Sequence, residues 1–182
     1  MVPCKVEKKG KMMRYNWNNI TLIGMPAAGK STVGVLLAKR LGYKFLDSDL
    51  LIQEKEERLL KEIIAAEGLE GFLAIEERIN REIDANRTVI APGGSVIYGA
   101  SAMEHFKEIG TVVYLKISYE ELEKRLGNLV DRGVALKDGM SLLDLYRERV
   151  PLYEKYADVT IEEAGKSGGQ VVDELRMLVE WG

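Results

Sequence analysis

Residues 24–31 read Gly24-Met25-Pro26-Ala27-Ala28-Gly29-Lys30-Ser31 and match the pattern G-x-x-x-x-G-K-[ST] at every position. An apolar run at residues 20–23 precedes the match, and residues 31–41 follow it with apolar side chains at helical spacing. This order of strand, tight loop and helix is typical of a phosphate-binding loop, in which Lys30 reaches the β and γ phosphates of a nucleotide and Ser31 binds Mg²⁺. A glycine turn that merely caps a helix is the alternative, and the flanking strand and helix favour nucleotide binding.

Short apolar runs alternate with amphipathic segments along the rest of the chain. Strands are expected at residues 20–23, 43–46, 88–91, 111–117 and 159–161, and helices at 31–41, 101–108, 119–126, from 141 towards 150, and 170–181. Residues 50–85 are helical in pattern and heavily charged, and breaks at Gly68 and Gly71 predict two or three helices packed as a subdomain. The alternation predicts an α/β fold with a mainly parallel sheet covered by helices on both faces.

A length of 182 residues with 46% hydrophobic content is suited to one compact domain. Basic residues outnumber acidic ones in residues 1–17, which lack apolar periodicity, so we expect a flexible basic lead-in followed by a single domain over 18–182. The alternative for this segment is a basic docking arm. Residues 127–139 contain glycines and charges without any period, and we expect a mobile loop there.

The charge and cysteine content exclude several classes of protein. A net charge of −3 and a sequence pI near 5.4 argue against nucleic-acid or anionic-membrane partners. The single cysteine, Cys4, excludes an internal disulfide and a cysteine-based zinc site, and it indicates a reducing compartment. Because the apolar runs are also too short for a membrane span and no signal peptide is evident, we expect a cytoplasmic monomer that acts on a small molecule.

Two carboxylates, Asp47 and Asp49, follow the second expected strand. Ligands of open parallel sheets bind beyond the carboxyl ends of the strands, so both carboxylates are expected to face the phosphate-binding loop. Phosphoryl transfer requires a carboxylate for the metal and a base near the acceptor hydroxyl. The alternative is that Asp49 only caps the following helix.

Several stretches together resemble the shikimate kinase family. They are Gly29-Lys30-Ser31-Thr32-Val33-Gly34, Leu37-Ala38 with Leu41, Phe45-Leu46-Asp47-Ser48-Asp49, Val89-Ile90-Ala91-Pro92-Gly93-Gly94 and Arg149-Val150-Pro151-Leu152-Tyr153. The resemblance extends from about residue 20 to the C-terminus. It implies a P-loop three-layer sandwich with a five-stranded parallel sheet, a helical substrate-binding subdomain and a mobile lid at about residues 127–140. The implied activity is transfer of the γ-phosphoryl group of ATP to a hydroxyl of shikimate.

The resemblance also implies roles for individual residues. Asp47 would hold Mg²⁺ through water with Ser31 as the second metal ligand, and Asp49 would orient or deprotonate the acceptor hydroxyl. The implied catalytic set is Lys30, Asp49 and Arg132, with ATP bound by Gly24, Ala27, Ala28, Gly29, Lys30, Ser31, Thr32 and Arg125, and the substrate by Asp49, Gly93, Gly94 and Arg149. Arg125 would lie near the adenine, Arg132 would reach from the lid to the phosphates, and Arg149 would pair with the substrate carboxylate. The alternative for each arginine is an exposed charge of little consequence.

The sequence departs from the family mainly on the acceptor side. Leu73 replaces a substrate-binding arginine, and an apolar side chain cannot pair with a carboxylate. Arg78 and Arg81, farther along the same helical stretch, are alternative sources of that charge, and another hydroxylated metabolite such as homoserine or gluconate is the alternative acceptor. Ala27 replaces a further glycine of the loop, and Ser95 follows Gly93 and Gly94 where a third glycine is usual.

The residues argue against two other functional classes. A GTPase switch is disfavoured because the chain has no Asn-Lys-x-Asp motif for guanine. A binding protein that has lost catalysis is disfavoured because Lys30, Ser31, Asp47 and Asp49 are all present.

Overall fold

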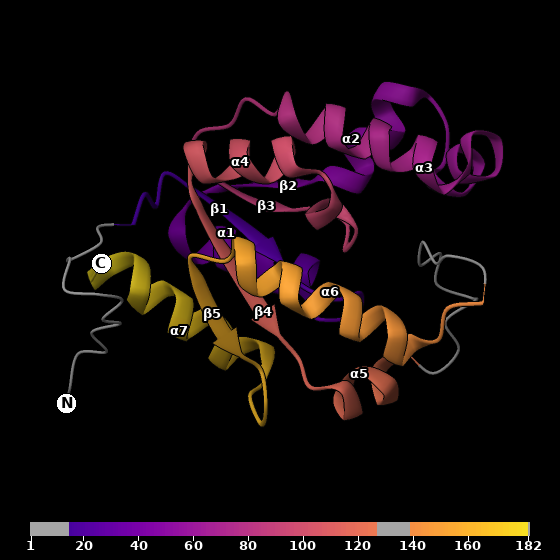
Figure 1. Ribbon diagram of the computed structural model, residues 1–182. Coiled ribbons are helices and arrows are strands. Elements are labelled where there is room, and N and C mark those ends of the chain that lie inside the picture. Colours follow the sequence, from indigo (N-terminus) through magenta and orange to yellow (C-terminus); the bar gives the residue numbers. More distant parts are fainter. Residues whose placement is uncertain (1–14, 127–138, 182) are drawn as a thin grey trace.

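The computed structural model describes residues 15–126 and 139–181, and a five-stranded parallel sheet forms its centre (Figure 1). The strands lie in the order β2-β3-β1-β4-β5, and all four neighbouring pairs are parallel. Their bounds are β1 (Asn19–Ile23), β2 (Lys44–Asp47), β3 (Thr88–Ala91), β4 (Thr111–Lys116) and β5 (Val159–Glu162). The predicted α/β fold with a five-stranded parallel sheet is therefore confirmed.

Helices connect successive strands, as parallel pairing requires. Their bounds are α1 (Lys30–Leu41), α2 (Ser48–Glu56), α3 (Leu60–Arg81), the short 3₁₀ helix η1 (Val96–Tyr98), α4 (Ala100–Ile109), α5 (Tyr119–Leu126), α6 (Leu142–Tyr156) and α7 (Gly168–Trp181). None of the helices in the described part of the chain is long and apolar enough to span a membrane.

Apolar side chains cover both faces of the sheet, which gives three layers. Helices α1 and α7 pack on one face, where Leu37 and Leu175 are fully buried. Helices α4, α5 and α6 pack on the other face, where Phe106, Leu122 and Tyr153 are fully buried. The two apolar layers hold the strands rigid, so the loops at the carboxyl ends of the strands start from fixed positions.

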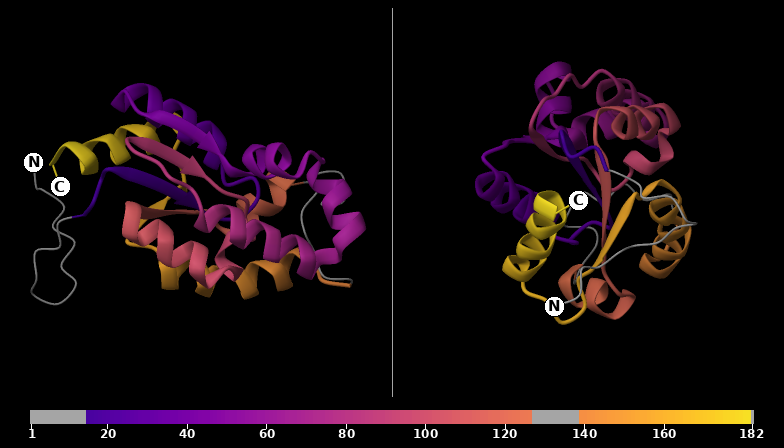
Figure 2. Two further views of the ribbon diagram at one scale, coloured as in Figure 1. Left: turned by 90° about the horizontal axis from the view of Figure 1, so that it is seen from above. Right: turned by 90° about the vertical axis from the view of Figure 1, so that its left-hand side faces the viewer.

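Helices α2 and α3 form the predicted helical subdomain around a separate apolar cluster of Ile52, Ile63, Phe72 and Ile79. In Figure 2 (left) this pair lies at the end of the molecule opposite to the C-terminal end of α7. Helix α3 is kinked at Gly68, whose φ of 69° lies in the left-handed region, as the glycine there suggested. The predicted break at Gly71 is wrong, because the helix continues through it while Phe72 and Ile79 keep packing on the cluster.

The described part of the N-terminal segment contacts the domain. Trp17 packs against the apolar layer of α1 and α7, and its carbonyl accepts a hydrogen bond from the Tyr43 hydroxyl at 3.1 Å. The Thr111 hydroxyl donates to the Asn16 carbonyl at 2.7 Å. The rest of the predicted lead-in, and residues 127–138 of the predicted lid with Arg132, lie outside the described residues.

Asn19 ties the start of the central strand to two other segments of the chain. Its amide Nδ2 donates to the carbonyls of Ala85 at 2.8 Å and Ile109 at 2.9 Å, and its Oδ1 accepts from the Thr88 amide at 3.1 Å. The side chain is fully buried. One side-chain amide thus binds three buried or half-buried backbone groups around the starts of β3 and β4, and the sequence pattern gave no sign of it.

We expect Asn19→Ala to lower the free energy of unfolding by about 3 kcal/mol, because three backbone groups would be left buried without partners. Urea unfolding checks this value. The neighbouring exposed residue supplies the control, since Asn18→Ala should change stability by no more than about 0.5 kcal/mol. Equal stability of the two variants would contradict the role given to Asn19.

Candidate active site

The loop after β1 turns back sharply enough to reach the start of α1. Gly24 has a φ of 153°, and a Cβ on it would lie 2.7 Å from the Leu115 carbonyl oxygen, so this position requires glycine. Ala27 at φ 63° and Gly29 at φ 74° also adopt left-handed conformations. Ala27 does so at a cost of about 1–2 kcal/mol, because its Cβ crowds the following carbonyl in this conformation.

Arg125 holds the strained part of this loop from the side of α5. Its Nη1 donates to the Ala27 carbonyl at 3.2 Å and to Glu163 Oε2 at 2.9 Å, and its Nε donates to Glu121 Oε1 at 3.0 Å. Glu163 is 7% exposed, and burial raises its pKa. Arg125 thus contacts the loop, while its expected place near the adenine stays a prediction, and sequence reasoning missed Glu163.

Lys30 folds over the same loop at the N-terminus of α1. Its Nζ donates to the carbonyls of Gly24 at 3.0 Å and Met25 at 3.1 Å. Burial lowers the pKa of Lys30 to about 8, and the nearby carboxylate of Asp49 opposes that shift. The loop therefore carries a positive charge in surroundings of low polarity, where a phosphate would gain most from it.

Asp47, at the end of β2, uses both carboxylate oxygens. Its Oδ1 accepts from the backbone amides of Asp49 at 3.0 Å and Leu50 at 3.4 Å, which caps α2. Its Oδ2 accepts from the Ser31 hydroxyl at 3.3 Å. Asp47 and not Asp49 is therefore the helix cap, and the alternative considered for Asp49 is wrong. The bond to Ser31 brings the two residues expected to hold a metal ion side by side.

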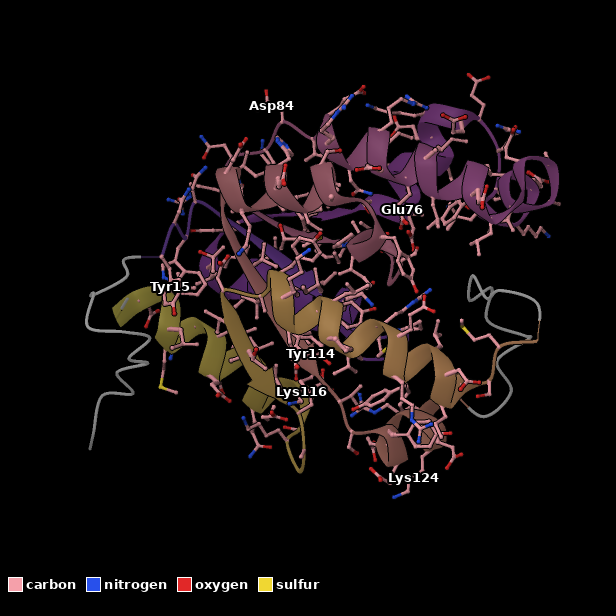
Figure 3. The ribbon with its side chains drawn as sticks, in the orientation of Figure 1. Tyr15, Glu76, Asp84, Tyr114, Lys116 and Lys124 are labelled. Carbon is pink, nitrogen blue, oxygen red and sulfur yellow. The ribbon has the colours of Figure 1, made fainter. Side chains whose placement is uncertain are left out.

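Asp49 and the buried Glu76 converge on Gly93. A Cβ at Gly93 would lie 2.8 Å from Asp49 Oδ1 and 2.7 Å from Glu76 Oε1, so both carboxyl groups approach its bare backbone. Glu76 is 1% exposed and lies on α3, facing the loop that follows β3 (Figure 3). Burial raises the pKa of Glu76 to about 7, and burial together with the neighbouring Asp47 raises that of Asp49 to about 6.

Arg149 of α6 approaches the same loop from the opposite side. It is 2% exposed, and its Nη1 lies 3.1 Å from the point where a Cβ of Gly94 would stand. The Tyr153 hydroxyl, one helical turn later, donates to the Gly94 carbonyl at 2.6 Å. The Tyr153 ring stacks on Tyr114 of β4 with 5.1 Å between centroids, which anchors α6 to the sheet.

One cavity of about 330 Å³ lies among these groups, although Glu76, Arg125 and Tyr153 do not line it. Ten of the site residues expected from the sequence line it, namely Ala27, Gly29, Lys30, Ser31, Thr32, Asp47, Asp49, Gly93, Gly94 and Arg149. Leu60, Ile64 and Phe72 of the helical subdomain add an apolar wall. A loop that suits phosphate thus lines the same cavity as two carboxylates and a buried guanidinium. Glu76 was not among the site residues expected from the sequence, where it is one of many acidic residues in a charged helix.

Leu73 does not line this cavity. It borders a second, mostly apolar cavity of about 90 Å³ on the other side of Arg149, together with Leu69 and Leu145. Arg78 is turned away, because its Nη2 pairs with Glu56 Oε1 at 2.6 Å on the exposed side of the subdomain. Among the described residues, Arg149 is therefore the arginine that lines the large cavity, and Arg78 does not replace the charge missing at Leu73.

Comparisons with known proteins agree with this geometry. A family model described as shikimate kinase matches residues 26–180. A shikimate kinase of Persephonella marina is 34% identical over 158 residues, which cover 86% of this chain and 96% of the relative, and one of Chlorobium chlorochromatii is 36% identical over 172 residues, covering 88% and 90%. A solved shikimate kinase of Acinetobacter baumannii in complex with shikimate has a TM-score of 0.81 and 34% identity, covering 90% of this chain and 93% of that one.

The raised pKa of Glu76 predicts that the protein loses stability as the pH rises from 4.5 to about 7. In this window the folded protein keeps a proton that the unfolded chain has released, so the free energy of unfolding falls with pH, by at most about 1.4 kcal/mol per unit. Glu76→Gln should remove this part of the slope, as urea unfolding at several pH values would show. Glu70→Gln, an exposed change on the same helix, is the control, and parallel pH profiles for wild type and Glu76→Gln would contradict the prediction.

Proposed function

The chain belongs to the shikimate kinase family, and from this membership we propose that it transfers the γ-phosphoryl group of ATP to a hydroxyl group of shikimate. The observation that carries the proposal is that Lys30, Ser31, Asp49 and Arg149 all line one cavity. An anionic donor and an anionic acceptor can then bind in the same cavity. The relatives give no support to homoserine or gluconate as the acceptor.

The loop side of the cavity suits the phosphates of ATP. Backbone amides at the start of α1 would bind phosphate oxygens, and Lys30 would exchange its two loop carbonyls for the β and γ phosphates. Arg125 would face the nucleotide from the flank of the loop. Positioning and neutralisation of charge supply most of the catalysis in such a transfer.

Ser31 and Asp47 fit a magnesium ion that enters with ATP. Their oxygens are hard ligands that lie 3.3 Å apart on the cavity wall. Residues 15–126 and 139–181 contain no cluster of three metal-ligating side chains, and a nucleotide-bound Mg²⁺ needs only one or two protein ligands besides phosphate oxygens and water. When bound, the ion would neutralise charge on the phosphates.

The opposite side suits the acceptor. Arg149 would pair with the carboxylate of shikimate, and Gly93 and Gly94 would let the ring approach the backbone. Asp49 would accept a hydrogen bond or the proton from the attacking hydroxyl, and a pKa of about 6 leaves it ionised at neutral pH and still basic enough to act. Arg132 of the proposed lid would add a positive charge at the phosphates.

The direct test is to incubate the protein with MgATP and shikimate and to follow phosphorylated shikimate by ³¹P NMR. We expect acceptor-dependent turnover of ATP, and homoserine and gluconate should give none above background. Lys30→Met should stay folded by circular dichroism and lose most of the activity, because the lysine acts on phosphate charge and not on packing. A folded Lys30→Met protein with normal turnover, or a wild type inactive on shikimate, would overturn the proposal.

Asp49→Asn should lower kcat by at least about 100-fold and change the KM for ATP little. In the wild type, kcat should fall as the pH drops through about 6, because protonated Asp49 cannot accept the hydroxyl proton. That acid limb should be absent from the residual activity of Asp49→Asn. Asp84→Asn, an exposed change, is the control. An equal loss of ATP affinity would place Asp49 in the nucleotide site instead.

A further inference from the structure

Tyr98, at the end of η1, contacts Arg149 in two ways without lining the large cavity. Arg149 Nε donates to the Tyr98 hydroxyl at 3.3 Å, and the guanidinium carbon lies 5.4 Å from the centre of the tyrosine ring. The Tyr98 hydroxyl in turn donates to Glu148 Oε1 at 2.5 Å. The three side chains form a chain of hydrogen bonds, in which the Tyr98 hydroxyl donates to Glu148 and accepts from Arg149.

The surroundings strengthen this chain. Leu69, Leu73 and Leu145 border the small cavity beside Tyr98 and keep the local polarity low. Burial and the carboxylate of Glu148 raise the pKa of Tyr98, so the hydroxyl keeps its proton at neutral pH and remains a donor to Glu148. Its lone pairs therefore stay available to Arg149.

The bond to Tyr98 engages the Nε edge of the Arg149 guanidinium. Nε is directed to the tyrosine, while Nη1 lies beside Gly94 on the cavity wall. The guanidinium group is planar, so fixing Nε and the stacking face fixes the direction of its terminal nitrogens. A carboxylate can accept two parallel hydrogen bonds from those nitrogens only in one plane.

We propose that Tyr98 is a positioning residue, which orients the Arg149 guanidinium for the carboxylate of the acceptor. The inference rests on the proposed function and deepens it. In the described part of the chain no second arginine lines the large cavity, since Leu73 is apolar and Arg78 pairs with Glu56. Recognition of the acceptor carboxylate therefore depends more on the orientation of Arg149 than it would if a second arginine lined the cavity.

Tyr98→Phe tests the proposal, because it keeps the ring under the guanidinium and removes only the hydroxyl. We expect the KM for shikimate to rise about tenfold, the loss of one charge-assisted hydrogen bond, with kcat and the KM for ATP within about twofold of wild type. The control is Tyr146→Phe on α6, which removes a tyrosine hydroxyl bonded to the Ile117 carbonyl at 3.0 Å and should leave all three constants unchanged.

Two further measurements separate positioning from a structural role. With the uncharged carboxamide of shikimate as acceptor, Tyr98→Phe and wild type should have the same KM, because this acceptor has no carboxylate for Arg149 to pair with. In an Arg149→Lys background, Tyr98→Phe should change the KM for shikimate little further, since lysine has no planar guanidinium for Tyr98 to orient. Glu148→Gln keeps an acceptor for the hydroxyl and should raise the KM for shikimate less, about threefold.

The outcomes are distinguishable. If wild type neither binds nor phosphorylates shikimate, the proposed function fails and the inference fails with it. If wild type is active and Tyr98→Phe has an unchanged KM for shikimate, the inference alone fails. A rise in KM that is equal for shikimate, its carboxamide and ATP, or a comparable effect of Tyr146→Phe, would also overturn it, because the hydroxyl would then only support the fold.

Discussion

The site depends on one consequence of strand order. Because β3 lies between β2 and β1, the carboxylates at the end of β2 must pass over the end of β3 to meet the loop that follows β1. Gly93 stands at that crossing, and any side chain there would collide with Asp49. The backbone at Gly93 therefore has to be bare, and the position of the Asp49 carboxylate near Lys30 depends on it.

Charge in the site is balanced within a small volume. Carboxyl groups that come together in low polarity hold their protons more tightly, and a lysine in the same surroundings holds its proton less tightly. Asp49 and Glu76 show the first shift and Lys30 the second, so all three titrate closer to neutrality than they would in water. Such groups can exchange or redirect protons at little cost when an anionic ligand enters.

Much of this arrangement could be predicted from the sequence, and the exceptions have physical reasons. The loop motif and the alternation of strands and helices gave the fold, because both are local patterns, and they placed Asp47 and Asp49 at the right edge of the sheet. Local patterns do not show which side chains distant in sequence will meet. Asn19, Glu76 and Tyr98 act through partners far along the chain, so they looked like ordinary polar residues. Gly71 was misread because tertiary packing overrode its low helix propensity.

Asn19 also bears on how the protein folds and unfolds. Its three hydrogen bonds join residues that are 66, 69 and 90 positions apart in the chain. Contacts of such long sequence separation are costly in chain entropy and form only after the strands on both sides of β1 have docked. The amide therefore closes the sheet late, and its contribution should govern how slowly the native state opens more than how fast the chain collapses. The lifetime of the folded protein in the cell, where opening exposes the chain to proteases, then rests in part on one buried amide far from the reaction.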